Sequence, residues 1–307
     1  MSHSHGSAAN RSPGQGRRLL IALALNLGIA VAEVVGGAIS GSLALIADAA
    51  HNLSDAGSVL VSYIAWRIAQ RAANERRTFG YARAETVGAL INLTTLIMIG
   101  LYLLWEAGTR FLEPVEVVPT TVLIVGVIAL VEDLLAAWVL RKDLGSLNVR
   151  STFLHMIADA LGTVAVIASG IAIMIWGPSA SWVDPAVTAL IAVYVLVHGS
   201  TEIRESIAVL MDSAPKGFDH DGLLRHLRSA DGVVDVHHLH VWEISEGRTA
   251  IEVHLATDRN DLAAATSLKE ALKKSLHDQF EIEHATIEME LAGMVEHDRD
   301  IVPKAEG

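Results

Sequence analysis

The sequence predicts an α-helical membrane domain with six transmembrane helices, followed by a small cytoplasmic α+β domain with a ferredoxin-like αββαβ order. The first observation is composition: 51% of the 307 residues are hydrophobic and only 19% are charged, which is unusual for a soluble protein. The second is distribution, because the apolar runs lie between Leu19 and Leu210, whereas the chain after Met211 resembles an acidic soluble domain. The third is the spacing H-x-x-x-D, which occurs in two of the apolar runs.

Six segments are long enough to cross a bilayer, which takes about 20 apolar residues in a helix. We place them at 19–40, 43–68, 85–111, 117–140, 153–176 and 182–210. Arg and Lys occur before the first segment and in the loops after the second and fourth, whereas the alternate loops contain none. By the positive-inside rule, both termini are expected in the cytoplasm.

Hydrophobic alternation and periodicity predict the elements of the region after Met211. They are helices at 218–230 and 262–280 and strands at 233–244, 249–257 and 284–291. The chain is therefore expected to have a flexible cytoplasmic N-terminal tail (1–18), a membrane domain (19–211), a cytoplasmic domain (212–293) and a C-terminal tail (294–307).

The two H-x-x-x-D strings predict a metal site inside the membrane domain. They are His51 to Asp55 in the second predicted span and His155 to Asp159 in the fifth. Residues four apart share a helix face, so each string presents one imidazole and one carboxylate in the same direction. Two such helices face to face would complete a tetrahedral shell around a divalent metal ion. Ionisable groups at membrane depth are costly, which favours a functional role.

The charges of these four side chains fit a divalent ion. Two carboxylates and two neutral imidazoles become nearly neutral overall when a divalent ion binds, which matters where the medium penalises charge. Protons bind the same ligands, so protons and metal compete. Four protein ligands leave no open position for a nucleophilic water, and no HExxH string is present. We therefore expect a transporter and not an enzyme.

Composition narrows the choice of ligand and partner. The chain has no cysteine, so a metal site must use His, Asp or Glu, which suits zinc, cobalt or cadmium better than copper(I). The formal net charge of −12 and the lack of a basic stripe argue against nucleic-acid binding.

Other polar residues also fall within the predicted spans. Asp48 lies three residues before His51 and is expected to face the same cavity. Asp133 could hydrogen-bond a ligand or relay a proton. The remaining residues of this kind are expected to bond between helices or to lie at an interface. They are Glu33, Asn92, Glu106, Glu132 and Asp184.

Motifs along nearly the whole chain resemble those of the cation diffusion facilitator family, in its zinc-transporting (zinc, cadmium and cobalt resistance) branch. Besides the paired H-x-x-x-D strings, they are Arg77-Thr78-Phe79-Gly80-Tyr81, Ser146-Leu147-Asn148-Val149-Arg150 and Val236-His237-His238-Leu239-His240-Val241-Trp242. The resemblance implies a homodimeric antiporter that exports Zn²⁺ from the cytoplasm in exchange for protons by alternating access, with no organic cofactor. The short Arg141–Arg150 loop is typical of bacterial members, which implies the inner (plasma) membrane.

The resemblance also implies a metal-binding, dimerising cytoplasmic domain, in which Zn²⁺ is a regulatory ligand. His237 matches one position where relatives bind cytoplasmic zinc. Four further residues match other such positions: His240, His254, His284 and Glu290. Strict alternation along the first strand places His237 on the face of Leu239 and Val241, opposite His240. The loop 67–83 has no histidine, so the second metal site of some relatives is not expected there.

Three alternatives remain open at this point. Within transport, the substrate could be Co²⁺, Cd²⁺, Ni²⁺ or Fe²⁺, because affinity order alone does not decide substrate choice. An intramembrane zinc hydrolase would need an open water position and a general base. A membrane metal sensor would bind metal without flux.

Overall fold

The computed structural model of the chain describes residues 13–140, 147–245 and 247–294. The side chains of residues 13–25, 139–140, 147–152 and 155 lie outside the described part, as do most of the two predicted tails. Contacts divide the chain into two compact units. The first consists of residues 1–61 and 91–203, and the second of residues 62–90 and 204–307.

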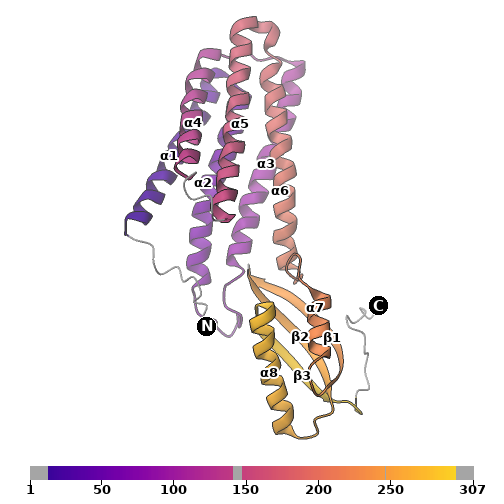
Figure 1. Cartoon of the computed structure of the whole chain (residues 1–307). Helices are drawn as coiled ribbons and strands as arrows, with labels where there is room; N and C mark the ends of the chain where they lie inside the picture. The colour runs from indigo at the N-terminus through magenta and orange to yellow at the C-terminus, as the bar shows by residue number, and fades with distance from the viewer. Residues whose placement is uncertain (1–12, 141–146, 246, 295–307) are drawn as a thin grey trace. The chain divides into compact units, whose positions relative to one another are not determined.

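Six long helices form the apolar part of the chain, close to the predicted bounds (Figure 1). They are α1 (Pro13–Ser40), α2 (Leu43–Ala69), α3 (Ala84–Leu112), α4 (Pro119–Leu140), α5 (Leu147–Trp176) and α6 (Val183–Leu210), with a 3-10 turn, η3 (Gly177–Ala180), between the last two. Among the described residues, four stretches are long and apolar enough to cross a membrane: Ala84–Leu112, Pro119–Trp138, Met156–Ala180 and Val183–Leu210. A shorter apolar helical stretch covers Asn26–Ser40.

In the first unit, acidic side chains are buried while large apolar side chains are exposed. Glu33 and Asp48 are 0% and 3% exposed, whereas Ile91 and Met98 on α3 are 61% and 63% exposed. Helix α4 packs against both α1 and α5. This distribution fits helices surrounded by lipid, where the exterior is apolar and polar groups are satisfied inside the bundle.

Asp184, at the start of α6, caps the N-terminus of α2. Its carboxylate accepts hydrogen bonds from the Ser42 hydroxyl and from the backbone N–H of Leu43, the latter at 2.8 Å. The first N–H groups of a helix have no partner within that helix, so a buried carboxylate placed there satisfies them. The bond joins residues 141 positions apart and fixes the α2 start against α6.

The second unit contains the small sheet and its two helices. Its elements follow the predicted αββαβ order: α7 (His220–Arg228), β1 (Val233–Ser245), β2 (Arg248–Thr257), α8 (Leu262–Phe280) and β3 (Ile282–Leu291). The strand order is β1-β2-β3, with β1 antiparallel and β3 parallel to β2. Asp219 and Asp261 cap the two helices by accepting from the backbone N–H groups of Gly222 and Ala264.

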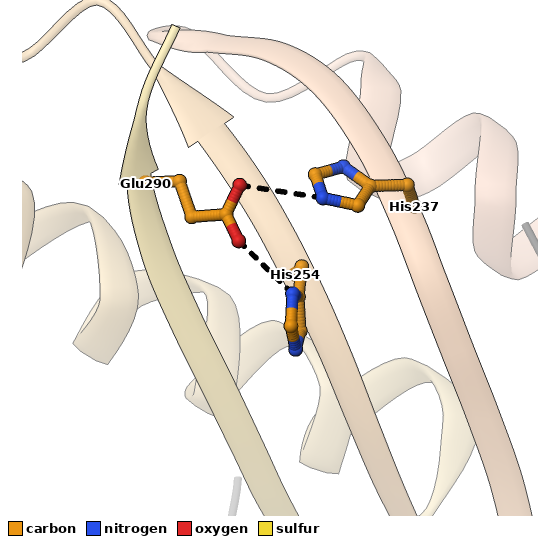
Figure 2. A group of neighbouring side chains, drawn as sticks. All are labelled: His237, His254 and Glu290. Carbon is orange, nitrogen blue, oxygen red and sulfur yellow. Dashed lines mark hydrogen bonds and ion pairs between the residues drawn. The ribbon is translucent and has the colours of Figure 1, made fainter. Parts of the chain in front are cut away.

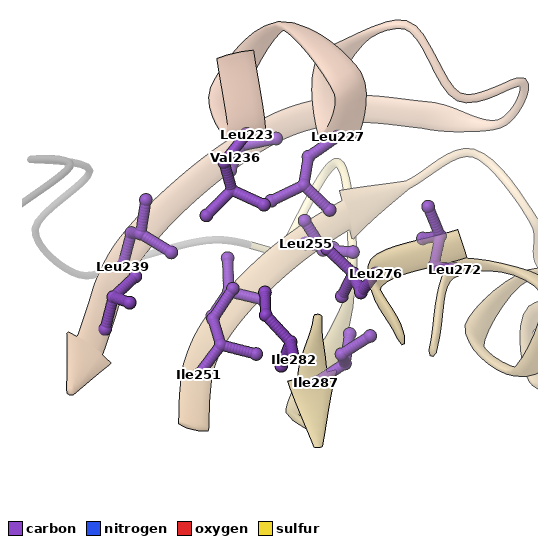
Figure 3. Close-up of a cluster of buried hydrophobic side chains, with 12 residues drawn as sticks. Leu223, Leu227, Val236, Leu239, Ile251, Leu255, Leu272, Leu276, Ile282 and Ile287 are labelled. Carbon is purple, nitrogen blue, oxygen red and sulfur yellow. The ribbon is translucent and has the colours of Figure 1, made fainter. Parts of the chain in front are cut away.

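One face of the sheet packs against α7 and α8 to form an apolar core (Figure 3). Leu223 and Leu227 from α7 meet Leu272 and Leu276 from α8 over strand residues such as Val253. All five side chains are at most 3% exposed. This core gives the sheet domain its own source of stability and leaves the opposite face of the sheet for polar side chains.

A β-bulge in β1 corrects the predicted faces of this strand. His237 pairs with His254, but His240 pairs with Glu252, so β1 has one more residue than β2 across this interval. His238 supplies the extra residue and adopts a left-handed φ of +49°. Leu239 therefore lies in the core while His237 faces away from it, and the prediction that these two share a face is wrong.

Candidate metal centres

Helices α2 and α5 bring three of the four predicted membrane ligands together. His51 Nε2 lies 3.1 Å from Asp159 Oδ1 and 3.9 Å from Asp55 Oδ2. One ligand atom from each residue lies within 4.8 Å of the other two, so one metal ion can reach all three. The side chain of His155 lies outside the described residues.

The donor set suits a borderline divalent ion. One imidazole nitrogen and two carboxylate oxygens converge, without the sulfur that would favour copper(I). His51 is only 8% exposed, and its ring lies nearly perpendicular to that of Tyr194 at a centroid distance of 6.3 Å.

A groove in the first unit leads to this group and adds two residues that sequence reasoning did not single out. His198 and Glu202, one turn apart on α6, line the groove together with His51 and Asp55. His198 Nε2 lies 3.1 Å from Glu202 Oε1, and both side chains are about half exposed. Their H-x-x-x-E spacing resembles the two strings that predicted the metal site, so the signal was present in the sequence.

Asp48 and Asp133 are connected to a metal-site residue through Thr163. The Thr163 hydroxyl is 3.0 Å from Asp48 Oδ2, 3.1 Å from Asp133 Oδ2 and 3.2 Å from the Asp159 carbonyl oxygen. A single residue of α5 therefore connects two carboxylates of α2 and α4 to a backbone atom of a candidate ligand.

The second group lies on the face of the sheet opposite the core and takes one residue from each strand (Figure 2). Glu290 of β3 lies between two imidazoles: Oε2 is 3.3 Å from His237 Nε2, and Oε1 is 3.0 Å from His254 Nδ1. The three ligand atoms lie within 4.8 Å of one another. His237 is fully buried, and the side chains of the other two are 13% and 11% exposed.

His240 and His284, also predicted for this site, lie outside that group. His240 pairs with Glu252 across the strands, and the His284 ring packs on Phe79 at 5.5 Å. His238 lies nearer, with its ring 4.4 Å from that of His254. Burial, together with the neighbouring His254 and His240, lowers the pKa of His238. The sequence could not place His238 because a bulge leaves no mark in strand alternation.

A metal group shared by two helices of an apolar bundle, with a second group on a small sheet, defines an integral membrane protein that handles metal cations. The chain belongs to the cation efflux family, as the sequence motifs predicted. Residues 19–211 match the cation efflux transmembrane domain, and residues 215–292 match the cytoplasmic domain of cation efflux proteins.

Relatives that match nearly the full chain carry names that concern metal transport. The chain is 36% identical to the "Cadmium, cobalt and zinc/H(+)-K(+) antiporter" of Bacillus subtilis, covering 100% of this chain and 97% of that protein. It is 37% identical to the "Metal cation efflux system protein CzcD" of Cupriavidus metallidurans, covering 94% and 90%. It is 35% identical to the "Zinc transporter ZitB" of Escherichia coli, covering 94% and 93%.

Proposed function

We propose that the protein exports Zn²⁺ from the cytoplasm in exchange for protons by alternating access. The observation that carries the proposal is the convergence of His51 and Asp55 with Asp159 from two helices. In this proposal His155 is the fourth ligand, because it lies four residues before Asp159 on α5. Two imidazoles and two carboxylates would form a tetrahedral Zn²⁺ site without an open position for water, which supports transport over hydrolysis.

The same ligands explain how protons can drive the ion out. Carboxylates and imidazoles must lose protons to bind metal, so protonation from the far side of the membrane competes with Zn²⁺ for them. The groove lined by His198 and Glu202 supplies an approach for a cation. The name of the Bacillus subtilis relative, which includes both zinc and H⁺, supports this exchange.

We further propose a six-span homodimer in a bacterial plasma membrane, with both termini in the cytoplasm. The charge of the alternate loops supports this orientation. The match to the cytoplasmic domain of cation efflux proteins supports dimerisation through a ferredoxin-like domain. In that domain His237, His254 and Glu290 would bind a regulatory Zn²⁺, which favours one state of the dimer through differential affinity.

Zinc uptake into proteoliposomes tests the central proposal. With the purified protein reconstituted and a pH gradient imposed, we expect Zn²⁺ flux that collapses when the gradient is dissipated. Asp159→Ala removes one carboxylate ligand and is expected to abolish this flux. Glu113→Gln, a charge removal at an exposed position, is the control and should transport normally. Zinc flux that is absent from the wild type, or unchanged in Asp159→Ala, would contradict the proposal.

A second candidate substrate follows from the relatives, two of whose names concern cadmium and cobalt or metal cations in general. Competition in the same vesicles decides the order of preference. Zinc as the preferred substrate predicts that equimolar Cd²⁺ or Co²⁺ reduces Zn²⁺ flux by less than unlabelled Zn²⁺ does. The reverse result would assign the site to another divalent cation.

A further inference from the structure

Three carboxylates outside the proposed metal ligands are buried together in the first unit: Glu33 of α1, Asp48 of α2 and Asp133 of α4. We call them the buried acidic cluster. They are 0%, 3% and 9% exposed, and Thr163 of α5, also fully buried, lies between the last two. An ionised carboxylate that is buried without a positive partner or hydrogen-bond donors is costly, so these three groups need a source of neutralisation.

The Thr163 hydroxyl has one hydrogen and more than one possible acceptor. Its oxygen is within hydrogen-bond distance of Asp48 Oδ2, Asp133 Oδ2 and the Asp159 carbonyl oxygen. A hydroxyl donates one hydrogen, and an ionised carboxylate can only accept. Thr163 can therefore satisfy one ionised carboxylate at most. For both contacts to be hydrogen bonds, at least one of the two carboxyl groups has to carry a proton and donate it to the Thr163 oxygen.

Glu33 provides an independent observation. Its Oε2 accepts from Asn52 Nδ2 at 3.0 Å, but its buried Oε1 has no hydrogen-bond partner among the described residues. The strongest charged neighbours of Glu33 are all acidic, namely Asp48, Asp133 and Glu132. An ionised Glu33 would thus combine an unsatisfied oxygen with like-charge repulsion in a low-dielectric setting. A carboxylic acid there removes the charge and turns one oxygen into a donor.

The chain offers little positive charge to neutralise these groups. No Lys or Arg occurs in 19–66, 111–140 or 151–203. Arg110 of α3 bonds to Glu106 and to the Gly41 carbonyl oxygen. Among the described side chains, the titratable groups that act on the cluster are Glu132 of α4, His51 of α2 and Asp159 of α5. Of these only His51 can become positive, and it lies against Asp159.

We propose that Glu33, Asp48 and Asp133 form a proton-binding site separate from the metal ligands, which loads when metal leaves and empties when metal binds. This inference rests on the proposed antiport. A divalent ion held by His51, Asp55 and Asp159 acts on the cluster by Coulomb repulsion of its protons. Each proton passes from a carboxyl O–H to water and leaves a carboxylate behind. The positive charge of the bound metal ion thus replaces the positive charge of the released protons in the same part of the bundle.

Two transport modes measured in the same vesicles test the site. Exchange of Zn²⁺ for Zn²⁺ across the membrane needs the metal ligands but no net proton movement, whereas uptake driven by a pH gradient needs both. Asp133→Asn keeps the shape of the side chain and a hydrogen-bond donor toward Thr163 while removing the titration. We expect exchange at the wild-type rate but weaker gradient-driven uptake, because the metal ligands still exchange protons for Zn²⁺ while the proton of the cluster is lost. Glu33→Gln should behave alike, and Glu113→Gln should retain both modes.

Proton release gives a second readout. Adding Zn²⁺ to the purified, weakly buffered protein should release about one proton fewer per metal in Asp133→Asn than in the wild type. Infrared spectra of the metal-free wild type should show a protonated carboxyl band at neutral pH that Asp133→Asn and Glu33→Gln reduce. This measurement needs no active variant, so it holds even where a variant fails to transport.

The outcomes separate this inference from the proposed function. A wild type without gradient-driven zinc flux overturns the antiport itself. A wild type with such flux, together with an Asp133→Asn variant whose gradient-driven uptake and proton release both equal those of the wild type, overturns the proton site alone. The absence of a protonated carboxyl band from the spectrum of the metal-free wild type would likewise overturn the proton site alone. Release of K⁺ in place of protons on Zn²⁺ binding, lost in Asp133→Asn, would assign the cluster to K⁺.

Discussion

His238 connects backbone geometry to the candidate cytoplasmic site. Its φ of +49° is unusual for a residue with a Cβ, and such a conformation costs of order 1–2 kcal/mol. The extra residue turns His237 to the face of the sheet that carries His254 and Glu290. The strain therefore accompanies the placement of a candidate metal ligand.

Replacing His238 by Gly and by Ala tests this strain. Both variants lose the imidazole, and they differ in their tolerance of a positive φ. We expect His238→Gly to exceed His238→Ala in free energy of unfolding by about 1 kcal/mol, the reverse of the usual order in strands. Urea denaturation of a fragment of residues 212–294, which contains its own apolar core, measures the difference. A more stable Ala variant would show that the bulge relaxes.

The lowered pKa of His238 predicts a pH dependence of the same domain. The folded domain binds this proton more weakly than the unfolded chain, whose histidine pKa is about 6.5. As pH falls through and below that value, the unfolded state gains protons first and the free energy of unfolding falls. Urea denaturation between neutral and mildly acidic pH should show a smaller fall for His238→Ala than for the wild type. If the free energy of unfolding fell equally with pH in both proteins, the lowered pKa of His238 would be contradicted.

At the scale of elements, the α2 start depends on a residue far away in the sequence. The helix bounds of α2 agree with the predicted segment 43–68, because a long apolar run needs only local information. Its cap cannot be read locally, since Asp184 reaches Ser42 and Leu43 across 142 and 141 positions. The sequence predicted only that Asp184 bonds between helices or lies at an interface.

Substitution of Asp184 should therefore act through α2. Asp184→Ala leaves the Leu43 N–H and the Ser42 hydroxyl without this acceptor, and such losses cost about 1–3 kcal/mol each when buried. Asp184→Asn keeps one acceptor oxygen and should cost less. In thermal unfolding of the detergent-solubilised protein, we expect the highest melting temperature for the wild type, a lower one for Asp184→Asn and the lowest for Asp184→Ala. An Ala variant as stable as the wild type would show that another group caps α2.

At the scale of the molecule, sequence patterns predicted the helices, the order of the sheet domain and the residue types of the candidate membrane site, whereas the candidates in the sheet domain came from the family resemblance. Spacing of four on one helix is local, so His51 and Asp55 could be paired without a structure. The approach of Asp159 to His51, 108 positions apart, depends on tertiary packing and could only be hypothesised. The bulge at His238 and the shared Thr163 hydroxyl depend on atomic positions that no periodicity encodes.

Metal that bridges separate elements should stabilise the whole protein. A proposed ion on His51, Asp55 and Asp159 ties α2 to α5, and unfolding would release it. At free Zn²⁺ about 100 times Kd, one such site adds about 2.7 kcal/mol to the free energy of unfolding. Zn²⁺ should raise the melting temperature of His254→Ala, a variant that tests the membrane site alone. It should raise the melting temperature of Asp159→Ala by less. The double variant should show no rise. A full Zn²⁺ effect in the double variant would place the stabilising ion elsewhere, and both proposed sites would be wrong.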